Sequence, residues 1–130
     1  MIGLDTNILV RYFAKDDPVQ GIRVKEFLRT LTTESPGFVS VISLIELVWV
    51  LRSQYKLTRV QLIGCIETLL NSPELVLESQ AAVNQSLHRF ASSKADFADC
   101  LIERSGHVAG CRETVTFDRN ASQMAGMRLL

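Results

Sequence analysis

Five carboxylates in this 130-residue sequence are candidates for metal binding or catalysis. Each lies close to a predicted boundary between a strand and a helix. They are Asp5, Glu46, Asp96, Asp99 and Asp118. Asp5 and Asp118 directly follow short runs of strand-forming residues, and the other three lie in the first turns of predicted helices. Sites in open α/β folds are built at the carboxyl ends of the strands, where the following helices also begin. We therefore expect these acids to converge on one edge of a sheet.

A cluster of carboxylates needs a compensating charge, because its members repel one another. Two carboxylates ~4 Å apart repel by roughly 4 kcal/mol at an effective dielectric constant of about 20. A whole domain is stable by only ~5–15 kcal/mol, so several such pairs force either protonation or the binding of a cation. All-oxygen ligands suit hard divalent ions, and the expected cofactor is therefore Mg²⁺ or Mn²⁺.

Each acid also has an ordinary structural explanation. Asp5 and Asp118 could each cap the following helix, because a carboxylate there accepts a backbone N–H from the first turn. Glu46 stands three residues after Ser43, which is the spacing of a capping box. Its mostly apolar neighbours, however, favour a carboxylate that is paired or bound to a cation.

Asp96 and Asp99 share one face of a predicted helix with a sixth acid, Glu103, since the three are spaced three and four residues apart. Asp96 could be the third position of a capping box that begins at Ser93, and Asp99 could be a solvated surface acid. Both gain from the helix dipole in either role. Glu103 continues the face and is expected to be solvated or to support the site indirectly.

Strands and helices alternate along the chain, which predicts an α/β fold with a parallel sheet and helices on both faces. The length fits a single domain over residues 1–130. The predicted strands are 1–4, 38–41, 75–77, 114–117 and 127–130. The predicted helices are 6–14, 18–31, 43–55, 58–70, 79–91 and 96–105, with a short helix or turn after Asp118.

Composition excludes little about function. Fourteen basic and fourteen acidic side chains give a net charge of zero, which favours neither nucleic acid nor an acidic partner. No apolar run approaches the ~18 residues of a membrane span, so we expect no membrane association. The three cysteines form no disulfide framework and no CxxC motif. We expect them to be small buried apolar groups and the protein to be cytoplasmic.

Four short motifs occur in an order and spacing that resemble a known family. They are Leu-Asp-Thr-Asn-Ile-Leu at 4–9, Ser-Val-Ile-Ser-Leu-Ile-Glu-Leu at 40–47, Asp-Phe-Ala-Asp-Cys-Leu-Ile at 96–102 and Thr-Phe-Asp at 116–118. The chain is similar in these motifs to PIN-domain ribonucleases, specifically the VapC-like toxins of bacterial type II toxin–antitoxin modules. The resemblance covers essentially the whole chain.

The resemblance implies a fold and a set of site residues. The fold would be a Rossmann-like three-layer α/β/α sandwich with a short parallel sheet of about five strands. The family's acidic quartet, its metal-binding residues, would be Asp5, Glu46, Asp99 and Asp118, and Asp96 matches an additional catalytic acid. The polar positions beside the ligands or the substrate would be Thr6, Asn7 and Thr116. Glu103 departs from the family's small residues, so its role stays open.

The resemblance also implies an activity and partners. Relatives are hydrolases that cleave RNA endonucleolytically through metal-activated water, leaving a 5′-phosphate and a 3′-hydroxyl, and thereby inhibit translation and growth. A cognate antitoxin protein silences them. They commonly form homodimers within larger toxin–antitoxin assemblies.

Other classes remain as alternatives. A catalytically silent α/β domain that binds a metal or a partner would share these motifs. A phosphatase-like hydrolase with a strand–Asp start needs a second acid two residues after Asp5, where this chain has Asn7. A receiver-type module needs a lysine after a late strand, and none follows residues 114–117.

Overall fold

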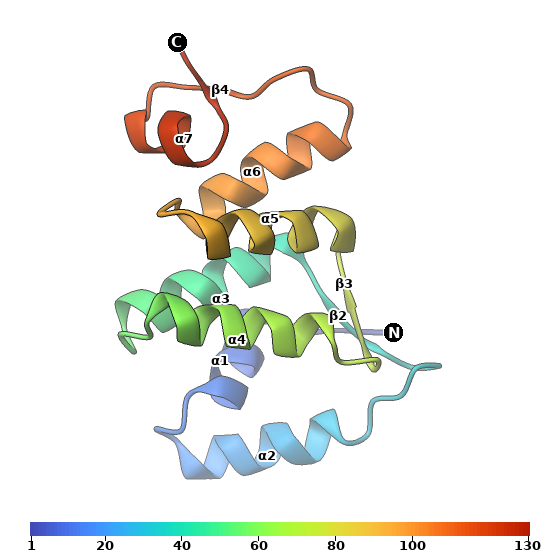
Figure 1. Ribbon diagram of the computed structural model, residues 1–130. Helices are drawn as coiled ribbons and strands as arrows, with labels where there is room; N and C mark the ends of the chain where they lie inside the picture. The colour runs from blue at the N-terminus through green and yellow to red at the C-terminus, as the bar shows by residue number, and fades with distance from the viewer. The chain divides into compact units, whose positions relative to one another are not determined.

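The structure, a computed structural model, describes residues 1–130 and divides the chain into two units, Met1–Glu78 and Ser79–Leu130. The first unit holds three strands and four helices, and the second holds two strands and three helices (Figure 1). None of the helices combines the length and hydrophobicity needed to cross a membrane.

Three short parallel strands form the sheet of the first unit: β1 (Ile2–Gly3), β2 (Gly37–Val39) and β3 (Leu75–Leu77), in the order β1-β2-β3. Backbone bonds of 2.9 Å continue the pairing past the strand ends, from Leu4 N to Phe38 O and from Glu78 N to Val39 O. Because the strands are parallel and in register, their carboxyl ends lie at one edge, as the sequence predicts.

The helices of the first unit are α1 (Thr6–Phe13), α2 (Pro18–Leu28), α3 (Val41–Ser53) and α4 (Arg59–Leu70). Helix α1 packs against both α2 and α3. The most deeply buried side chains of this unit are leucines and isoleucine spaced for helical faces: Leu9, Leu44, Leu47, Leu51, Leu62 and Ile66.

Three of the four predicted helix starts in this unit are confirmed, that of α1 at Thr6 among them, and one is wrong. Asp17 caps α2, and Thr58 forms a complete capping box with Gln61. Helix α3, however, is capped by Ser40, whose side chain accepts from Ser43 N at 3.0 Å. The cap therefore lies three residues earlier than Ser43, and the helix begins at Val41, two residues before the predicted range. Glu46 consequently lies in the second turn and takes no part in a capping box.

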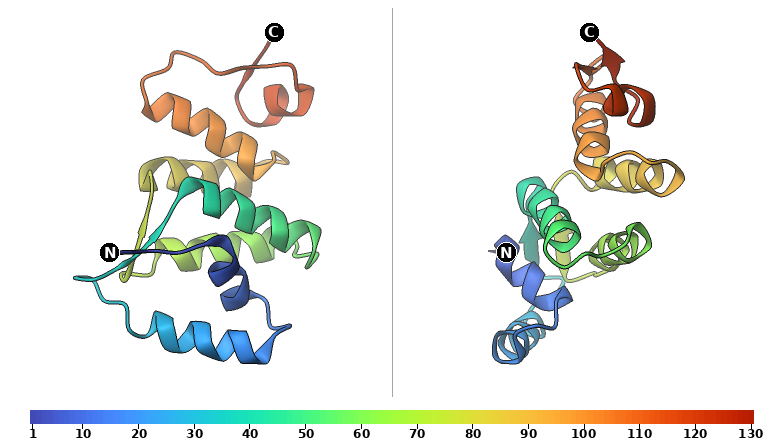
Figure 2. Two further views of the ribbon diagram at one scale, coloured as in Figure 1. Left: turned by 180° about the vertical axis from the view of Figure 1, so that it is seen from behind. Right: turned by 90° about the vertical axis from the view of Figure 1, so that its left-hand side faces the viewer.

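The second unit contains α5 (Gln80–Ser92), α6 (Phe97–Val108), β4 (Val115–Thr116), α7 (Arg119–Met124) and β5 (Arg128–Leu129). Helices α5 and α6 lie side by side (Figures 1 and 2). Phe90 and Phe97 meet edge to face, with ring centroids 5.6 Å apart, and help to hold the pair together. Ser79, the first residue of the predicted helix 79–91, instead precedes α5 in a left-handed conformation, and its side chain makes no capping hydrogen bond.

All five predicted strands form, which supports the α/β class. They are paired in a three-stranded and a two-stranded parallel sheet, β4 with β5. A single five-stranded sheet is therefore not confirmed. The strands are only two or three residues long, and each can make few ladder hydrogen bonds.

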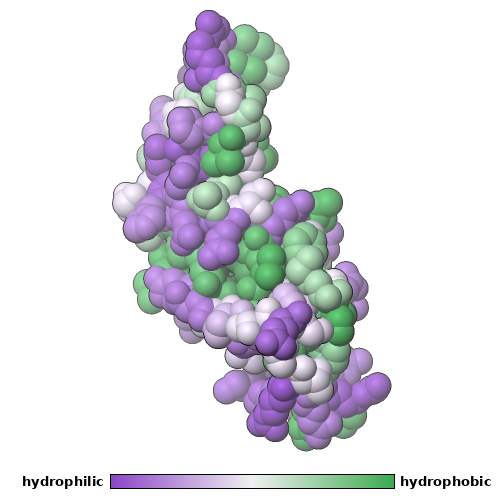
Figure 3. Space-filling view, turned by 90° about the vertical axis from the view of Figure 1, so that its right-hand side faces the viewer, coloured by the Kyte–Doolittle hydropathy of each residue, from purple (hydrophilic) through white to green (hydrophobic).

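Polar and apolar side chains mix on the surface, and Figure 3 shows one face on which hydrophobic groups lie among hydrophilic ones. Trp49 and Ile42 of α3 are largely exposed, so neither belongs to the core. The cysteines differ from one another: Cys100 is buried, Cys65 is half-buried and Cys111 is exposed. The expectation that all three are buried is therefore wrong for Cys111.

Candidate active site

Asp5 is separated from β1 by one residue, Leu4, and caps α1. Its backbone is extended, and its Oδ1 accepts from Thr6 N at 2.9 Å. The second carboxylate oxygen has no hydrogen bond and the residue is exposed, so Asp5 can cap a helix and still offer a ligand oxygen. The structural and chemical explanations of this residue are thus compatible.

Glu46 lies on α3, which packs against α1. Its Oε2 accepts a hydrogen bond of 2.9 Å from Thr6 Oγ1. Glu46 is exposed, and its pairing with a hydroxyl is the polar contact that its apolar sequence context called for. Thr6 therefore connects the helix turn capped by Asp5 to the second predicted acid of this unit.

Glu78 is an acid at the same sheet edge that sequence reasoning missed. It directly follows β3, and its Oε1 accepts from Val41 N at 2.8 Å. The carboxylate thereby satisfies a backbone donor in the first turn of α3, a position where negative charge is also favourable. The rule that singled out Asp5, an acid directly after a strand, would have found it.

Asp96 is the N-cap of α6. Its Oδ1 accepts from Ala98 N at 2.9 Å and from Asp99 N at 3.4 Å. The predicted capping box from Ser93 is therefore wrong, because Ser93 Oγ accepts from Ala95 N instead, before the helix begins. Asp96 itself begins the helix, which places Asp99 in its first turn.

Asp99 has the most unusual electrostatic environment of the predicted acids. Partial burial raises the pKa of its carboxyl, and the charges of Asp96 and Asp118 raise it further. These three acids of the second unit are therefore close enough to repel one another. A pKa raised by burial and by like charges is typical of functional sites.

Asp118 follows β4 and caps α7, since its Oδ1 accepts from Ala121 N at 3.0 Å. Its own backbone N–H donates to Thr116 Oγ1 at 2.9 Å. Thr116 thus stabilises the turn that contains Asp118, which is the supporting role expected of a polar residue beside a ligand.

Glu103 does not add a free charge to this group. The guanidinium of Arg104 donates to both its carboxylate oxygens, at 2.5 and 2.8 Å. The bond to Arg104 lowers the pKa of Glu103, against an opposing effect of burial. Glu103 therefore pairs with its neighbouring base, which answers the question of its role that the sequence left open.

The five predicted acids thus fall into two sets, Asp5 with Glu46 in the first unit and Asp96, Asp99 and Asp118 in the second. Within either unit, no three or more His, Cys, Asp or Glu side chains gather as a ready metal site. The donor chemistry nevertheless fits a hard divalent cation, because carboxylate oxygens dominate and the acids around Asp99 repel one another.

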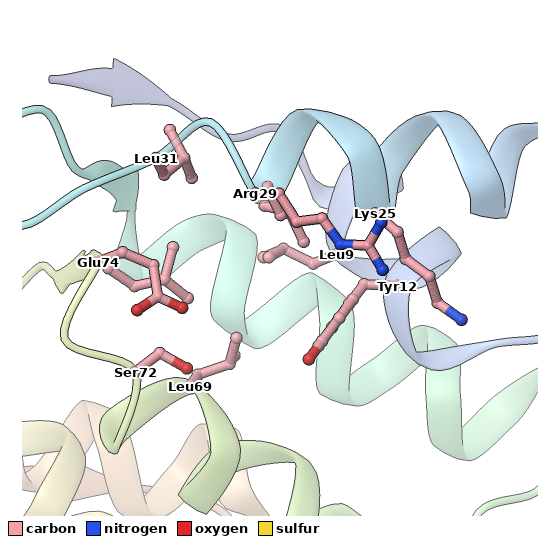
Figure 4. A pocket seen from close by; sticks show the side chains of 10 residues that line it. Leu9, Tyr12, Lys25, Arg29, Leu31, Leu69, Ser72 and Glu74 are labelled. Carbon is pink, nitrogen blue, oxygen red and sulfur yellow. The ribbon is translucent and has the colours of Figure 1, made fainter.

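A crevice lies within the first unit, away from these acids, and has a volume of about 550 Å³. Its floor is apolar, with Leu9 and Leu69 among the lining side chains, and its rim carries Lys25, Arg29 and Glu74 (Figure 4). Bases and an acid thus share this rim. We refer to it below as the α2–α4 crevice.

The match to known proteins agrees with the α/β fold. The chain belongs to the PIN domain family, whose model matches residues 2–127 and so runs through both units. The chain is also similar to the VapC ribonuclease of Aquifex aeolicus (strain VF5). The two are 26% identical over 123 residues, which are 93% of this chain and 90% of that relative. The resemblance to VapC-like PIN-domain proteins, first seen in four short motifs, is therefore confirmed.

Proposed function

We propose that this protein is a divalent-metal-dependent endoribonuclease that acts as the toxin of a toxin–antitoxin pair. The observation that carries the proposal is the environment of Asp99, a half-buried acid whose pKa is raised by burial and by two neighbouring acids. In a PIN-domain chain, such an uncompensated cluster calls for a cation. The name of the Aquifex relative supports RNA as the substrate.

The proposed ligands of Mg²⁺ or Mn²⁺ are Asp5, Glu46, Asp99 and Asp118, with Asp96 as an additional acid of the site. When bound, the ion would polarise the phosphodiester and lower the pKa of the attacking water. Thr6 would hold the Glu46 carboxylate, and Thr116 would hold the turn of Asp118. We also propose that the five short strands act as one Rossmann-like sheet in the working enzyme, in a single domain over residues 1–130.

The proposed partners are the RNA substrate, a cognate antitoxin protein and a second copy of the chain. Ile42 and Trp49, seven residues apart on α3 and largely exposed, supply an apolar helix face that supports a homodimer. The antitoxin would join this dimer in a larger assembly. We propose that the protein works in the cytoplasm and that cleavage inhibits translation and growth.

The test is cleavage of a labelled cellular RNA pool by the purified protein with Mg²⁺ or Mn²⁺ and with a chelator. Asp99→Asn keeps the size of the side chain but removes its charge. Glu67→Gln, on the exposed face of α4, is the matched control. We expect wild type and Glu67→Gln to cut RNA only with metal, and Asp99→Asn to lose at least ~100-fold in rate. Equal cleavage by wild type and Asp99→Asn would contradict the proposed site, and metal binding without cleavage would favour a silent domain.

A further inference from the structure

Helix α2 faces two separate hollows, one on each side. Gln20, Arg23 and Phe27, spaced three and four residues apart, share one face of the helix. Lys25 and Arg29 lie on another face and line the α2–α4 crevice. The two faces differ in the charges that surround them, and this difference decides which hollow suits an anionic ligand.

The first hollow, which we call the α1–α2 groove, has a volume of about 340 Å³. This volume is at the lower end of the ~300–1,000 Å³ typical of small-ligand sites, and it favours one compact group over a large ligand. Its walls come from Asn7, Ile8 and Arg11 on α1 and from Gln20, Arg23 and Phe27 on α2.

Three side chains of the groove are available to a ligand. The amide groups of Asn7 and Gln20 are exposed and make no side-chain hydrogen bond, and each offers both a donor and an acceptor. Arg23 is exposed and forms no salt bridge. Arg11, by contrast, forms an ion pair with Asp16 and a hydrogen bond to the hydroxyl of Tyr55. Its side chain is therefore held in place, and its charge is already compensated.

The groove begins beside the proposed catalytic edge. Asn7 is two residues beyond Asp5, and Ile8 N donates to Asp5 O at 3.1 Å in the same turn. A ligand that fills the groove would therefore adjoin a ligand that is bound at Asp5. The α2–α4 crevice suits a polyanion less well, because Glu74 stands on its rim opposite the bases (Figure 4).

We propose that the α1–α2 groove binds one unpaired nucleotide of the RNA beside the phosphate that is cut. This inference rests on the proposed ribonuclease function and adds a specificity site to it. Phe27 provides an apolar surface for the base, and the amides of Gln20 and Asn7 hydrogen-bond to its edge. Arg23 contacts the adjacent phosphate. Single-stranded RNA is required, because only an unstacked base can enter so small a groove.

The experiment compares the positions and rates of cleavage on a library of single-stranded RNAs. Gln20→Ala tests reading of the base, and Arg23→Ala tests the phosphate contact. Arg29→Ala, at the C-cap of the same helix and on the crevice face, removes the same charge and is the control. Far-ultraviolet circular dichroism and melting verify that each variant folds, which we expect because all three positions are exposed.

We expect Gln20→Ala to relax the preference for one base at a single position beside the cut, with a loss of roughly tenfold on the preferred sequence. Arg23→Ala should weaken binding of all sequences similarly and reduce the salt dependence of binding by about one phosphate contact. Arg29→Ala should match wild type in both respects.

Two outcomes separate this inference from the proposed function. Suppose that wild type cuts RNA, that Gln20→Ala keeps the base preference and that Arg23→Ala keeps the salt dependence of binding. The proposal that the α1–α2 groove binds a nucleotide is then wrong, whereas the proposed ribonuclease function is supported. The same holds if these variants change only the affinity for an antitoxin. If wild type cuts no RNA under any metal condition, the proposed function itself fails, and this inference fails with it.

Discussion

The hydroxyl of Thr6 donates to the carboxylate of Glu46 at 2.9 Å, although the two residues are 40 positions apart. The bond joins the first turn of α1 to the second turn of α3, and Asp5 caps that same first turn of α1. A single threonine therefore sets the relative positions of two proposed ligands. The effect of Thr6 on the orientation of the site can therefore be tested while the charges of the acids are left unchanged.

Replacing Thr6 by valine should slow RNA cleavage without unfolding the protein. The substitution keeps the shape of the side chain but removes the donor to Glu46. A hydrogen bond to a charged group contributes ~1.5–3 kcal/mol. Because Glu46 is exposed, we expect a loss at the lower end of this range, which corresponds to about a tenfold lower rate constant of cleavage. Single-turnover cleavage measures it. Thr6→Ser retains the hydroxyl and should keep most of the rate, so equal losses in the two variants would argue against an orienting bond.

Asp99→Asn should stabilise the metal-free protein at pH 7. Asp99 is partly buried and is repelled by Asp96 and Asp118, so removing its charge relieves an unfavourable interaction. Mn²⁺ should raise the melting temperature of wild type by binding the folded state and should raise that of Asp99→Asn much less. Differential scanning fluorimetry with and without Mn²⁺ tests both parts. An identical metal-induced shift in the two proteins would show that Asp99 is not a ligand.

Asp16→Asn should destabilise the protein at neutral pH but not in acid. The hydrogen bond from Tyr55 at 2.7 Å, followed by the charge of Arg11, lowers the pKa of Asp16 below its ordinary value of 3.8. A lowered folded-state pKa gives stability that is fully present above the unfolded value and is lost as the pH falls through the folded value. Urea unfolding at pH 7 and in acid measures the difference between wild type and variant.

The neighbouring Asp17→Asn is the control for that comparison, because it removes the same charge while asparagine still serves as an N-cap. We expect it to change stability little at pH 7. A gap between Asp16→Asn and wild type that is equally wide at pH 7 and pH 3 would contradict the ionic origin of the effect.

Gly37→Ala should destabilise the first unit, whereas Gly3→Ala should not. A Cβ at Gly37 would lie only 2.9–3.0 Å from methyl groups of Leu31, Leu4 and Leu75. Overpacking of this kind costs roughly 1–3 kcal/mol. A Cβ at Gly3, on the adjacent strand, meets nothing within 4 Å. Chemical denaturation compares the stabilities of the two variants. Equal midpoints would mean that the leucine side chains move aside without a loss of stability.

Part of the fold follows from local sequence, and the start of α3 shows where such reasoning fails. Ser40 and Ser43 are both good caps, so local preference cannot choose between them. The choice depends on β3, since Glu78 N pairs with Val39 O and Glu78 Oε1 accepts from Val41 N. These contacts end the strand at Val39 and start the helix at Val41, from a partner 37 residues away.

The sequence by itself determined the alternation of strands and helices, the acids at their junctions and the family, because these depend on neighbouring residues and on the order of motifs. Only the tertiary structure decided that Thr6 holds Glu46, that Glu78 accepts a hydrogen bond from the first turn of α3, and that like charges surround Asp99. It also decided that Gln20, Arg23 and Phe27 line a groove beside Asn7. The physical reason is that hydrogen bonds, repulsion and groove walls depend on distances in space, which residues far apart in the chain acquire only when it folds.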